Sequence, residues 1–215
     1  MTQDRMTQDW MEQIYREMPP GDIPWNTQAL PKPFVELVES GEVTPCTTID
    51  LGCGAGNHAV WLAGRGFNVT GVDFAPSAIE LARENAENQG VSCRFLVADL
   101  LGGLPEVAET FAFAYDWAVL HHIFPEARPQ YVETVCRLLE PGGKYLSACF
   151  SEEDAGFGST EKYRKTPLGT VLYFSSLDEL RSLFEPHFTI ARLATVQVEG
   201  KTGGHLMNCA WMRGP

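Results

Sequence analysis

The sequence contains no long apolar run and no excess of positive charge. No stretch reaches the roughly 18 apolar residues of a membrane-spanning helix. The polar start, MTQDRMTQDW, lacks the basic residues and apolar core of a signal peptide, so we expect a cytoplasmic protein without a membrane partner. The formal net charge is −12, which repels the phosphates of nucleic acids. We therefore expect a small-molecule partner and no nucleic acid.

The six cysteines form no recognisable metal or redox motif. They are scattered along the chain, with no Cys-x-x-Cys pair and no spacing typical of zinc ligands. Several lie within apolar segments. We therefore expect free, buried thiols in a reducing compartment, and no metal site.

The chain has 215 residues, a length that suits one α/β domain spanning residues 1–215. Strand-like and helix-like segments alternate, which predicts a three-layer, Rossmann-like α/β sandwich around a mostly parallel sheet. Glycines between the last two strands suit a hairpin, which gives a seven-stranded sheet an antiparallel terminal strand. The expected strands are residues 47–51, 68–73, 92–98, 111–119, 144–150, 189–198 and 205–212, and the expected helices are 7–18, 28–40, 59–64, 77–88, 128–139 and 175–184.

Local signals mark where some of these helices begin and end. Ser77 follows Pro76 and is a candidate cap for the helix 77–88, and a serine also precedes the last helix. Pro141-Gly142-Gly143 is a stop and turn before the fifth strand.

Two segments stand outside the alternation. Residues 1–40 precede the first strand and contain two of the expected helices, so we interpret them as a helical lid. Residues 151–174 are a long connection that we expect to form a cap, since long connections are usually functional or mobile. Their aromatic and basic side chains predict a partly apolar acceptor pocket. The candidate substrate-binding residues are Tyr15, Trp25, Tyr163 and Arg164, although a basic residue on a loop is often only solvated.

The strongest motif is DLGCGAG, residues 50–56, directly after a predicted strand and before a predicted helix. Gly52, Gly54 and Gly56 allow a sharp turn and a close approach of the backbone to a ligand. A dinucleotide-binding loop has its third glycine one position later, where this chain has Asn57. The spacing therefore favours a ligand whose charged end is an amino acid over one with a pyrophosphate.

Acidic residues end the next two strands as well. Asp73 ends the second strand, where a carboxylate accepts from ribose hydroxyls, and Phe74 follows it as a candidate adenine contact. Asp99 ends the third strand and is followed by Leu100. Each acid has a structural alternative, because acids often cap the following helix. Their joint position at the carboxyl ends of strands, where open α/β sheets bind ligands, favours the binding role.

Taken in order, the segments resemble the class I S-adenosylmethionine-dependent methyltransferases between residues 47 and 150. The matching segments are DLGCGAG (50–56), GVDFAPSAIELAREN (71–85), VADL (97–100), AYDWAVLHHI (114–123) and LLEPGGKYL (138–146). The resemblance implies a seventh strand inserted antiparallel, which agrees with the terminal hairpin. It also implies S-adenosyl-L-methionine as the cofactor.

The resemblance assigns roles to the matching residues. The three glycines and Cys53 would line the methionine part of the cofactor, and Asp50 would orient its amino group. Asp73 would bind the ribose hydroxyls, and Asp99 and Leu100 would bind the adenine. Asp116, at the end of the fourth strand, would lie near the amino-acid end and the methyl group.

The segment Ile23-Pro24-Trp25-Asn26 is similar to a Pro-Trp segment in the thiopurine, thiol/halide and tellurite-type methyltransferases, where it lies over the cofactor. Asn26 departs from that pattern, in which an acid is frequent. The alternative for Trp25 is a core or interface aromatic.

The sulfonium methyl group of such a donor is already electrophilic, so the enzyme must place a nucleophile and exclude water. A thiol, halide or chalcogen acceptor needs no general base, whereas a hydroxyl or ammonium acceptor does. His121 and His122 follow the fourth strand and are candidate bases, together with Asp116 as a catalytic residue. The alternative is that one histidine satisfies a loop and the other faces solvent.

Two other functions remain open from the sequence. A nicotinamide-dependent oxidoreductase would also use a glycine loop and a strand-end acid, although Asn57 argues against it. A non-catalytic subunit that binds S-adenosylmethionine would carry the same glycines and acids. No Asn/Asp-Pro-Pro-aromatic motif follows the fourth strand, which argues against amino methylation of bases or glutamine. We expect a monomer or a homodimer.

Overall fold

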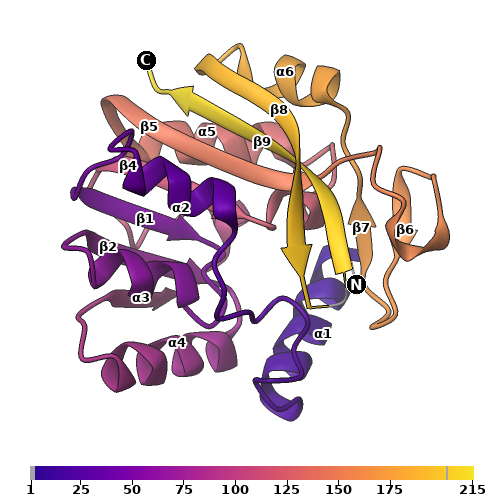
Figure 1. The fold of residues 1–215 in the computed structure, drawn as a ribbon, viewed down its shortest axis with the longest axis horizontal. Helices are drawn as coiled ribbons and strands as arrows, with labels where there is room; N and C mark the ends of the chain where they lie inside the picture. The colour runs from indigo at the N-terminus through magenta and orange to yellow at the C-terminus, as the bar shows by residue number, and fades with distance from the viewer. Residues whose placement is uncertain (1–2, 202) are drawn as a thin grey trace. The chain divides into compact units, whose positions relative to one another are not determined.

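The computed structural model describes residues 3–201 and 203–215, with side chains from residue 9 onward. The chain divides into two compact units. Unit 1 runs to Leu100 and includes the short segment at Lys201, and unit 2 comprises Leu101–Glu199 and Gly203–Pro215. The strands of the main sheet follow the order β3-β2-β1-β4-β5-β9-β8 (Figure 1). This order confirms the predicted α/β class, with a seven-stranded sheet and an antiparallel end.

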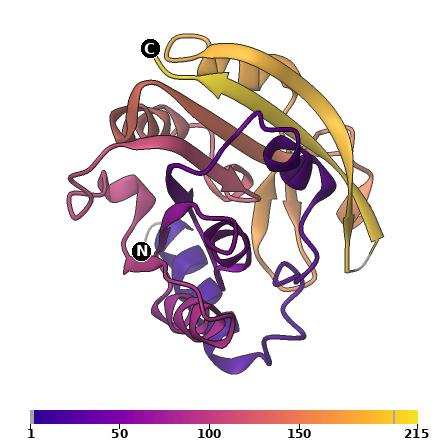
Figure 2. The same cartoon turned by 60° about the vertical axis from the view of Figure 1, so that its left-hand side comes forward.

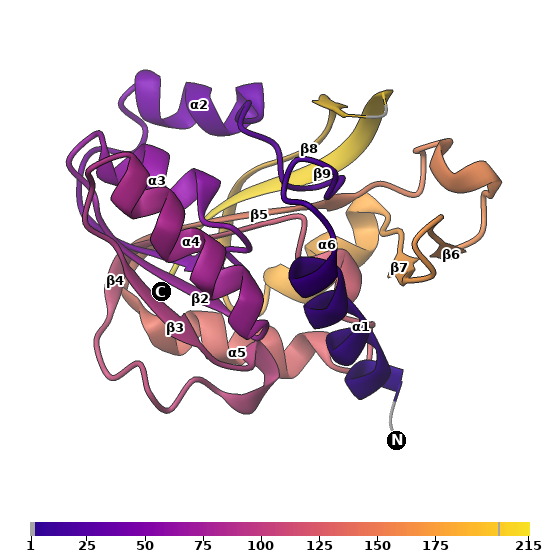
Figure 3. The same cartoon turned by 90° about the horizontal axis from the view of Figure 1, so that it is seen from below.

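Unit 1 is built on three parallel strands. Its elements are α1 (Gln3–Glu17), α2 (Lys32–Glu39), β1 (Thr47–Leu51), α3 (Asn57–Ala63), β2 (Asn68–Asp73), α4 (Pro76–Asn88) and β3 (Arg94–Val97). β2 pairs with both neighbours in parallel and is buried from Val69 to Asp73, as expected of a parallel strand covered on both faces. The helices α3 and α4 run side by side along these strands (Figure 3). This arrangement brings the carboxyl ends of β1 and β2 to one edge.

Unit 2 contains the rest of the sheet and a separate small ribbon. Its elements are β4 (Phe111–Trp117), α5 (Arg128–Leu138), β5 (Leu139–Phe150), β6 (Tyr163–Lys165), β7 (Val171–Tyr173), α6 (Leu177–Phe184), β8 (Thr189–Gly200) and β9 (Gly203–Arg213). β5 pairs in parallel with β4 and antiparallel with β9. Figure 2 shows the long, curved hairpin of β8 and β9 and the smaller pair of β6 and β7.

The predicted turn before the fifth strand is a break inside β5. The strand begins at Leu139, which pairs with Phe111 of β4, but its next partner on β4, Phe113, pairs with Lys144. The residues between them loop out, and Gly142 has a φ of 71°. The predicted range 144–150 is therefore the regular part of a longer strand.

Several predicted helix starts differ from the structure. α1 begins at Gln3, earlier than the predicted residue 7. α2 begins at Lys32, later than the predicted residue 28, because Pro31 holds an extended backbone just before it. α4 begins at Pro76 without a side-chain cap, and the Ser77 hydroxyl donates to Glu12 of α1 at 2.6 Å. A tertiary contact thus replaces the local cap. The cap of the last helix is confirmed, because Ser176 and Glu179 form a capping box at the start of α6.

The connection 151–174 contains the short strands β6 and β7, which were not predicted. All six cysteines are free thiols, and Cys53 and Cys149 are buried. Of the helices described, none has the length and apolar character needed to cross a membrane. Among the described residues, no group of His, Cys, Asp or Glu is arranged to hold a metal ion.

Candidate functional site

The glycine motif forms a tight loop between β1 and α3 in unit 1. Gly52, Gly54 and Gly56 have φ angles of 74°, 52° and 74°, a conformation that other residues rarely adopt. The Gly52 and Cys53 amides donate to the Val72 carbonyl at 2.7 and 3.0 Å, which fixes the loop to β2. The three predicted glycines therefore do what only glycine does without strain.

Two of these glycines also need the absence of a side chain. A Cβ atom on Gly54 would lie 2.6 Å from the Tyr15 hydroxyl. A Cβ atom on Gly56 would lie 2.9 Å from the Ala82 Cβ and 3.0 Å from the Phe95 ring. Gly56 thus packs α3 against its neighbours, whereas Gly54 faces the N-terminal segment.

Asp73 ties the end of β2 to the glycine loop. One carboxylate oxygen accepts from the Gly54 amide at 2.9 Å, and the other accepts from the Ala75 amide at 3.0 Å. The side chain is 6% exposed. Burial raises the pKa of Asp73 to about 6, although the backbone donors oppose that rise. The carboxylate predicted to bind ribose therefore also orders the loop.

The other predicted cofactor residues of unit 1 lie at the ends of its strands. Asp50 is buried on β1, and Phe74 is half-buried directly after β2. Asp99 is exposed after β3, and the adjacent Leu100 is buried. The predicted residues of the glycine loop and the strand ends thus belong to a single unit.

Tyr15 and Trp25 meet above the glycine loop. The Trp25 indole donates to the Tyr15 hydroxyl at 2.8 Å, and the two rings meet edge to face at 6.1 Å. Tyr15 is buried, and burial together with Asp73 raises the pKa of its phenol well above the usual value. The phenol is therefore a neutral hydrogen-bonding group next to Gly54.

Sequence reasoning missed the contacts that hold the N-terminal segment in place. Glu12 of α1 accepts from both the amide and the hydroxyl of Ser77, at 3.1 and 2.6 Å. The Lys201 ammonium donates to the carbonyls of Gly21 and Ile23, at 2.9 and 2.8 Å. The residues of each contact lie far apart in sequence, so no local sequence pattern predicts these contacts.

Asn26, which departs from the Pro-Trp pattern, and Asn57, which replaces the third glycine of a dinucleotide-binding loop, contact each other. The Asn57 amide donates to the Asn26 side-chain oxygen at 2.6 Å, and Asn85 donates to Asn57 at 3.1 Å. Asn57 therefore joins the Pro-Trp segment to α4. This pairing explains why an amide at position 26 suits an amide at position 57.

In unit 2, Asp116 lies inside a cage of hydroxyl groups. Tyr131 and Ser147 donate to its carboxylate at 3.1 Å each, and Tyr145 donates to it through a short hydrogen bond. Asp116 has no exposed surface, and burial raises its pKa to about 6 against these donors. The cage gives Asp116 the surroundings of a structural group, and its predicted role near the methyl group stays a prediction.

His121 and His122 follow β4 in a short 3₁₀ turn, Leu120–His122. The His121 ring stacks on Phe150 at 4.5 Å, and its Nδ1 accepts from the Phe150 amide at 3.4 Å. Burial lowers the pKa of His121 well below 6.5, and His122 adds to that effect. Burial also lowers the pKa of His122 to about 4. Both imidazoles are therefore neutral, and His121 carries its proton on Nε2.

Tyr163 and Arg164 point in different directions from β6. Tyr163 is 49% exposed and meets Phe124 and Tyr173 edge to face. Arg164 is 1% exposed, and its guanidinium donates to backbone carbonyls, including those of Glu161 and Glu152 at 2.8 and 2.9 Å. These carbonyls occupy the donors that Arg164 would offer a substrate. The substrate contact of Arg164 therefore stays a prediction that the surroundings of its guanidinium do not support.

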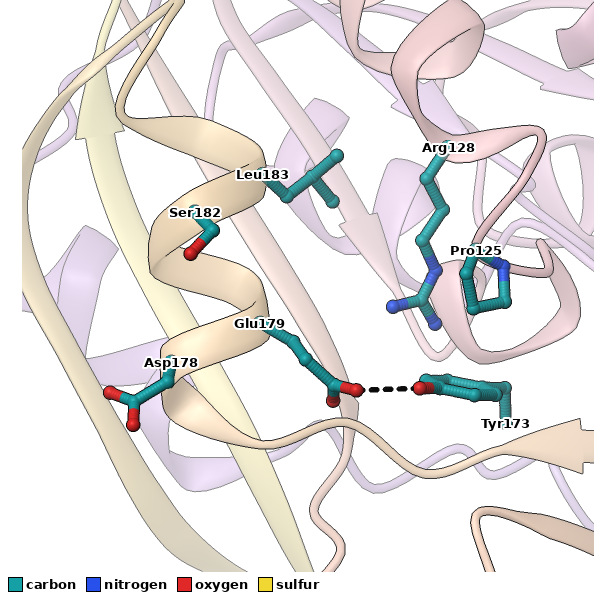
Figure 4. Close-up of a pocket in the computed structure, with 7 residues that line it drawn as sticks. All are labelled: Pro125, Arg128, Tyr173, Asp178, Glu179, Ser182 and Leu183. Carbon is teal, nitrogen blue, oxygen red and sulfur yellow. Dashed lines mark hydrogen bonds between the residues drawn. The ribbon is translucent and has the colours of Figure 1, made fainter.

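An open hollow of about 460 Å³ lies in unit 2 between α6 and the start of α5 (Figure 4). The side chains of α6 line one side, and Arg128, Pro125 and Tyr173 line the other. Glu179 accepts from Tyr173 at 2.6 Å, and Arg128 donates to Ser175 and to two carbonyls. Tyr173 and Glu179 bind each other, and Arg128 binds groups outside the lining, so we assign no ligand to this hollow.

Comparison with known proteins agrees with the resemblance found in the sequence. A family model described as a methyltransferase domain matches residues 49–143. A 2-heptyl-1-hydroxyquinolin-4(1H)-one methyltransferase of Mycobacteroides abscessus is 31% identical over 150 residues, which are 67% of this chain and 65% of that protein. The chain spans just under two thirds of the length of this relative, and less than half of several others.

Two solved structures have a similar fold. One comes from work on the conversion of a disulfide bond into a thioacetal group during echinomycin biosynthesis. It has a TM-score of 0.81 at 25% identity and covers 96% of this chain and 92% of its own. The other is the Burkholderia thailandensis 1,6-didemethyltoxoflavin-N1-methyltransferase, with a TM-score of 0.73 at 21% identity, covering 97% of this chain and 87% of its own. The matched segment, the glycine loop and the strand order together show that this chain belongs to the class I S-adenosylmethionine-dependent methyltransferases.

Proposed function

We propose that this chain transfers a methyl group from S-adenosylmethionine to a small-molecule acceptor. The observation that carries the proposal is the loop of three positive-φ glycines, joined to the strand-end carboxylate of Asp73 by the Gly54 amide. The spacing of the glycines suits the amino-acid end of the donor, and the acid suits its ribose. The bound donor would supply an electrophilic methyl group on a sulfonium sulfur.

The residues of unit 1 fit this donor. Gly52, Cys53, Gly54 and Gly56 would surround its methionine part, and Asp50 would orient the amino group. Asp73 would accept from the ribose hydroxyls, and Phe74, Asp99 and Leu100 would hold the adenine. Tyr15, which lies next to Gly54, and Trp25, which donates to Tyr15, would exclude water from this end of the site.

The protonation state of Asp73 matters for this role. A carboxylate accepts two hydroxyl hydrogen bonds, whereas the protonated acid loses part of that capacity. With a pKa of about 6, Asp73 is mostly ionised at neutral pH. We therefore place donor binding on the alkaline side of that pKa.

The two predicted histidines favour an acceptor that needs no strong base. His122, with a pKa of about 4, cannot hold a proton taken from a much weaker acid. His121 offers an N–H at Nε2 and not a lone pair, because its Nδ1 already accepts from Phe150. These properties support a thiol, halide or chalcogen nucleophile, or a hydroxyl acidic enough to arrive ionised. The relatives named for a hydroxyquinolone and for disulfide chemistry lie within this range.

Calorimetric titration of the full chain with S-adenosylhomocysteine and, separately, with NADH tests the cofactor assignment. We expect one saturable site for S-adenosylhomocysteine and none for NADH, and the reverse result would make the chain an oxidoreductase. Radiolabelled S-adenosylmethionine offered with a panel of thiols, halides, phenols and amines tests the reaction. Binding without transfer to any member of a broad panel would identify a non-catalytic subunit.

A further inference from the structure

Three asparagine side chains of unit 1 form a continuous chain of hydrogen bonds, which we call the amide relay. Asn85 of α4 donates from its side-chain nitrogen to the side-chain oxygen of Asn57, the first residue of α3, at 3.1 Å. Asn57 donates in the same way to Asn26 at 2.6 Å, and Asn26 donates to the Pro20 carbonyl at 2.9 Å. The amide relay therefore connects α4 and α3 to the Pro-Trp segment, and all of its members lie in unit 1.

The amide relay has a direction. In both Asn57 and Asn26, the side-chain oxygen accepts a hydrogen bond and the side-chain nitrogen donates one. Neither amide can turn over without placing two donors or two acceptors against each other. All three residues of the relay are half-buried, so water only partly replaces a lost partner. The relay is thus held in a single orientation from α4 to Pro20.

One end of the amide relay contacts the glycine loop. The Asn85 side chain also donates to the Ala55 carbonyl at 3.3 Å. Ala55 lies between Gly54, whose amide donates to Asp73, and Gly56, which has a φ of 74°. The loop is therefore held twice, by the carboxylate at the amide of one residue and by the relay at the carbonyl of the next.

The other end of the amide relay contacts the Pro-Trp segment. Asn26 directly follows Trp25, whose indole donates to the Tyr15 hydroxyl at 2.8 Å. That hydroxyl lies 2.6 Å from the position that a Cβ atom on Gly54 would take. The N-terminal part of the chain thus reaches the glycine loop by two routes, one through aromatic rings and one through the relay. The rings cover the loop, whereas the relay supplies the directional contacts that set the position of the segment.

We propose that Asn26 and Asn57 are positioning residues that hold the Pro-Trp segment against the glycine loop and so slow the release of the bound donor. They act through Trp25 and through the backbone of the loop. Placement of the segment and binding at the loop are linked, because the same relay contacts both. The proposal rests on the proposed function, since it takes the glycine loop as the place where the donor binds.

The direction of the amide relay predicts different effects of two isosteric substitutions. In Asn26→Asp, the carboxylate still accepts from Asn57, and only the exposed donation to Pro20 is lost. In Asn57→Asp, no hydrogen is left to donate to Asn26, and the Asn26 amide restores a bond only by turning its oxygen against the Pro20 carbonyl. Both variants add one negative charge at the same hydrogen bond. Side chains that only filled space would give equal effects, because asparagine and aspartate have nearly the same shape.

Calorimetry of the full chain with S-adenosylhomocysteine measures this difference. We expect Asn57→Asp to weaken binding about tenfold and Asn26→Asp to weaken it less than about threefold, because only the first breaks the link to the segment. Asn88→Asp, the same change at an exposed position of α4, is the matched control and should bind as wild type. Equal affinities of Asn26→Asp and Asn57→Asp would overturn the proposal.

Urea denaturation checks that each variant is folded. Asn57 lies in the first turn of α3, where an acid interacts favourably with the helix dipole. A weaker α3 therefore does not explain weaker binding by Asn57→Asp.

Fluorine NMR of protein labelled with 5-fluorotryptophan adds a readout that needs no ligand. Trp25→Phe identifies the Trp25 signal among those of the five tryptophans. We expect Asn57→Asp to shift this signal in the unliganded protein, and Asn26→Asp and Asn88→Asp to leave it near its wild-type position. An unmoved Trp25 signal in Asn57→Asp would also overturn the proposal.

The two measurements distinguish failure of the amide relay from failure of the proposed function. If the wild-type protein binds S-adenosylhomocysteine and the two aspartate variants behave alike, the relay does not position the segment. If the wild-type protein does not bind S-adenosylhomocysteine, the proposed function is rejected, and retention of the donor by the relay is rejected with it.

Discussion

Asp73 in unit 1 is the last residue of β2, and Asp116 in unit 2 is the last but one of β4. Both carboxylates are buried, and burial raises the pKa of each to about 6. Their donors differ. Asp73 accepts from two backbone amides, one of them in the glycine loop. Asp116 accepts from the hydroxyls of Tyr131, Tyr145 and Ser147, and its own surface is fully covered.

From this difference we propose that Asp73 is a binding group and Asp116 a supporting group. A carboxylate held by two backbone amides orders its loop and keeps acceptor capacity for a ligand. A carboxylate surrounded by side-chain hydroxyls uses its hydrogen-bond acceptor capacity on donors inside the protein. Equal pKa values therefore do not identify equal roles, because burial raises the pKa of a carboxyl group in both places.

Removal of the Asp73 carboxylate should have the largest effect. Asp73→Ala should weaken S-adenosylhomocysteine binding about 100-fold, because ligand hydrogen bonds to a charged group are worth roughly 1.5–3 kcal/mol and the Gly54 amide loses its acceptor. Calorimetry measures the affinity, and circular dichroism checks that the variant is folded. An unchanged dissociation constant in a folded Asp73→Ala protein would remove Asp73 from the site.

The matching change in unit 2 should act on stability. Asp116→Asn should lower the free energy of unfolding by about 2 kcal/mol, because a network of three hydroxyl donors loses its charged acceptor. Urea denaturation measures this loss, with Tyr131→Phe as a smaller control that deletes one hydroxyl. We expect S-adenosylhomocysteine affinity to stay within about twofold of wild type. A large loss of affinity at full stability would place Asp116 among the binding residues.

A methyl group at the glycine loop should act on binding through the N-terminal segment. Gly54→Ala should weaken S-adenosylhomocysteine binding about tenfold, because the new Cβ meets the Tyr15 hydroxyl and the φ of 52° disfavours alanine. Adding Tyr15→Phe should restore part of the affinity by removing that hydroxyl. No recovery in the double variant would show that backbone strain alone accounts for the loss.

The smallest expected effect is the pH dependence of cofactor binding. A ligand that prefers ionised Asp73 binds more weakly as pH falls through about 6, and the affinity should drop several-fold between pH 7 and pH 5.5. Asp73→Asn should abolish this dependence, and Asp116→Asn should leave it in place. Calorimetry at a series of pH values separates the two carboxylates, and a step retained in Asp73→Asn would assign it to another group.

The sequence predicted the parts of the fold that depend on local patterns. The ranges of β1 and β2 were predicted to the residue, because each is a β-branched, apolar run bounded by turn residues. The three positive-φ glycines were also predicted, since their spacing after a strand indicates a tight turn that favours glycine.

The parts that were missed depend on contacts between distant segments. Ser77 pairs with Glu12 and not with its own helix, which no local cap pattern reveals. Arg164 reads as a basic loop residue, but its guanidinium stacks over Phe174 at 3.8 Å in the interior. The pairing of β5 with β9 brings the Asp154 carboxylate within 3.4 Å of the His205 ring, and no local sequence pattern links two residues so far apart in the chain.

Backbone amide signals can report whether the glycine loop and Asp73 bind the methyl donor. Nitrogen–proton correlation spectra would be recorded during titration with S-adenosylhomocysteine. We expect saturable shifts of the Gly52, Gly54, Gly56 and Ala75 amides, and no such shifts with NADH. If these four signals do not move, while S-adenosylhomocysteine is bound elsewhere or not at all, the glycine loop and Asp73 do not bind the donor.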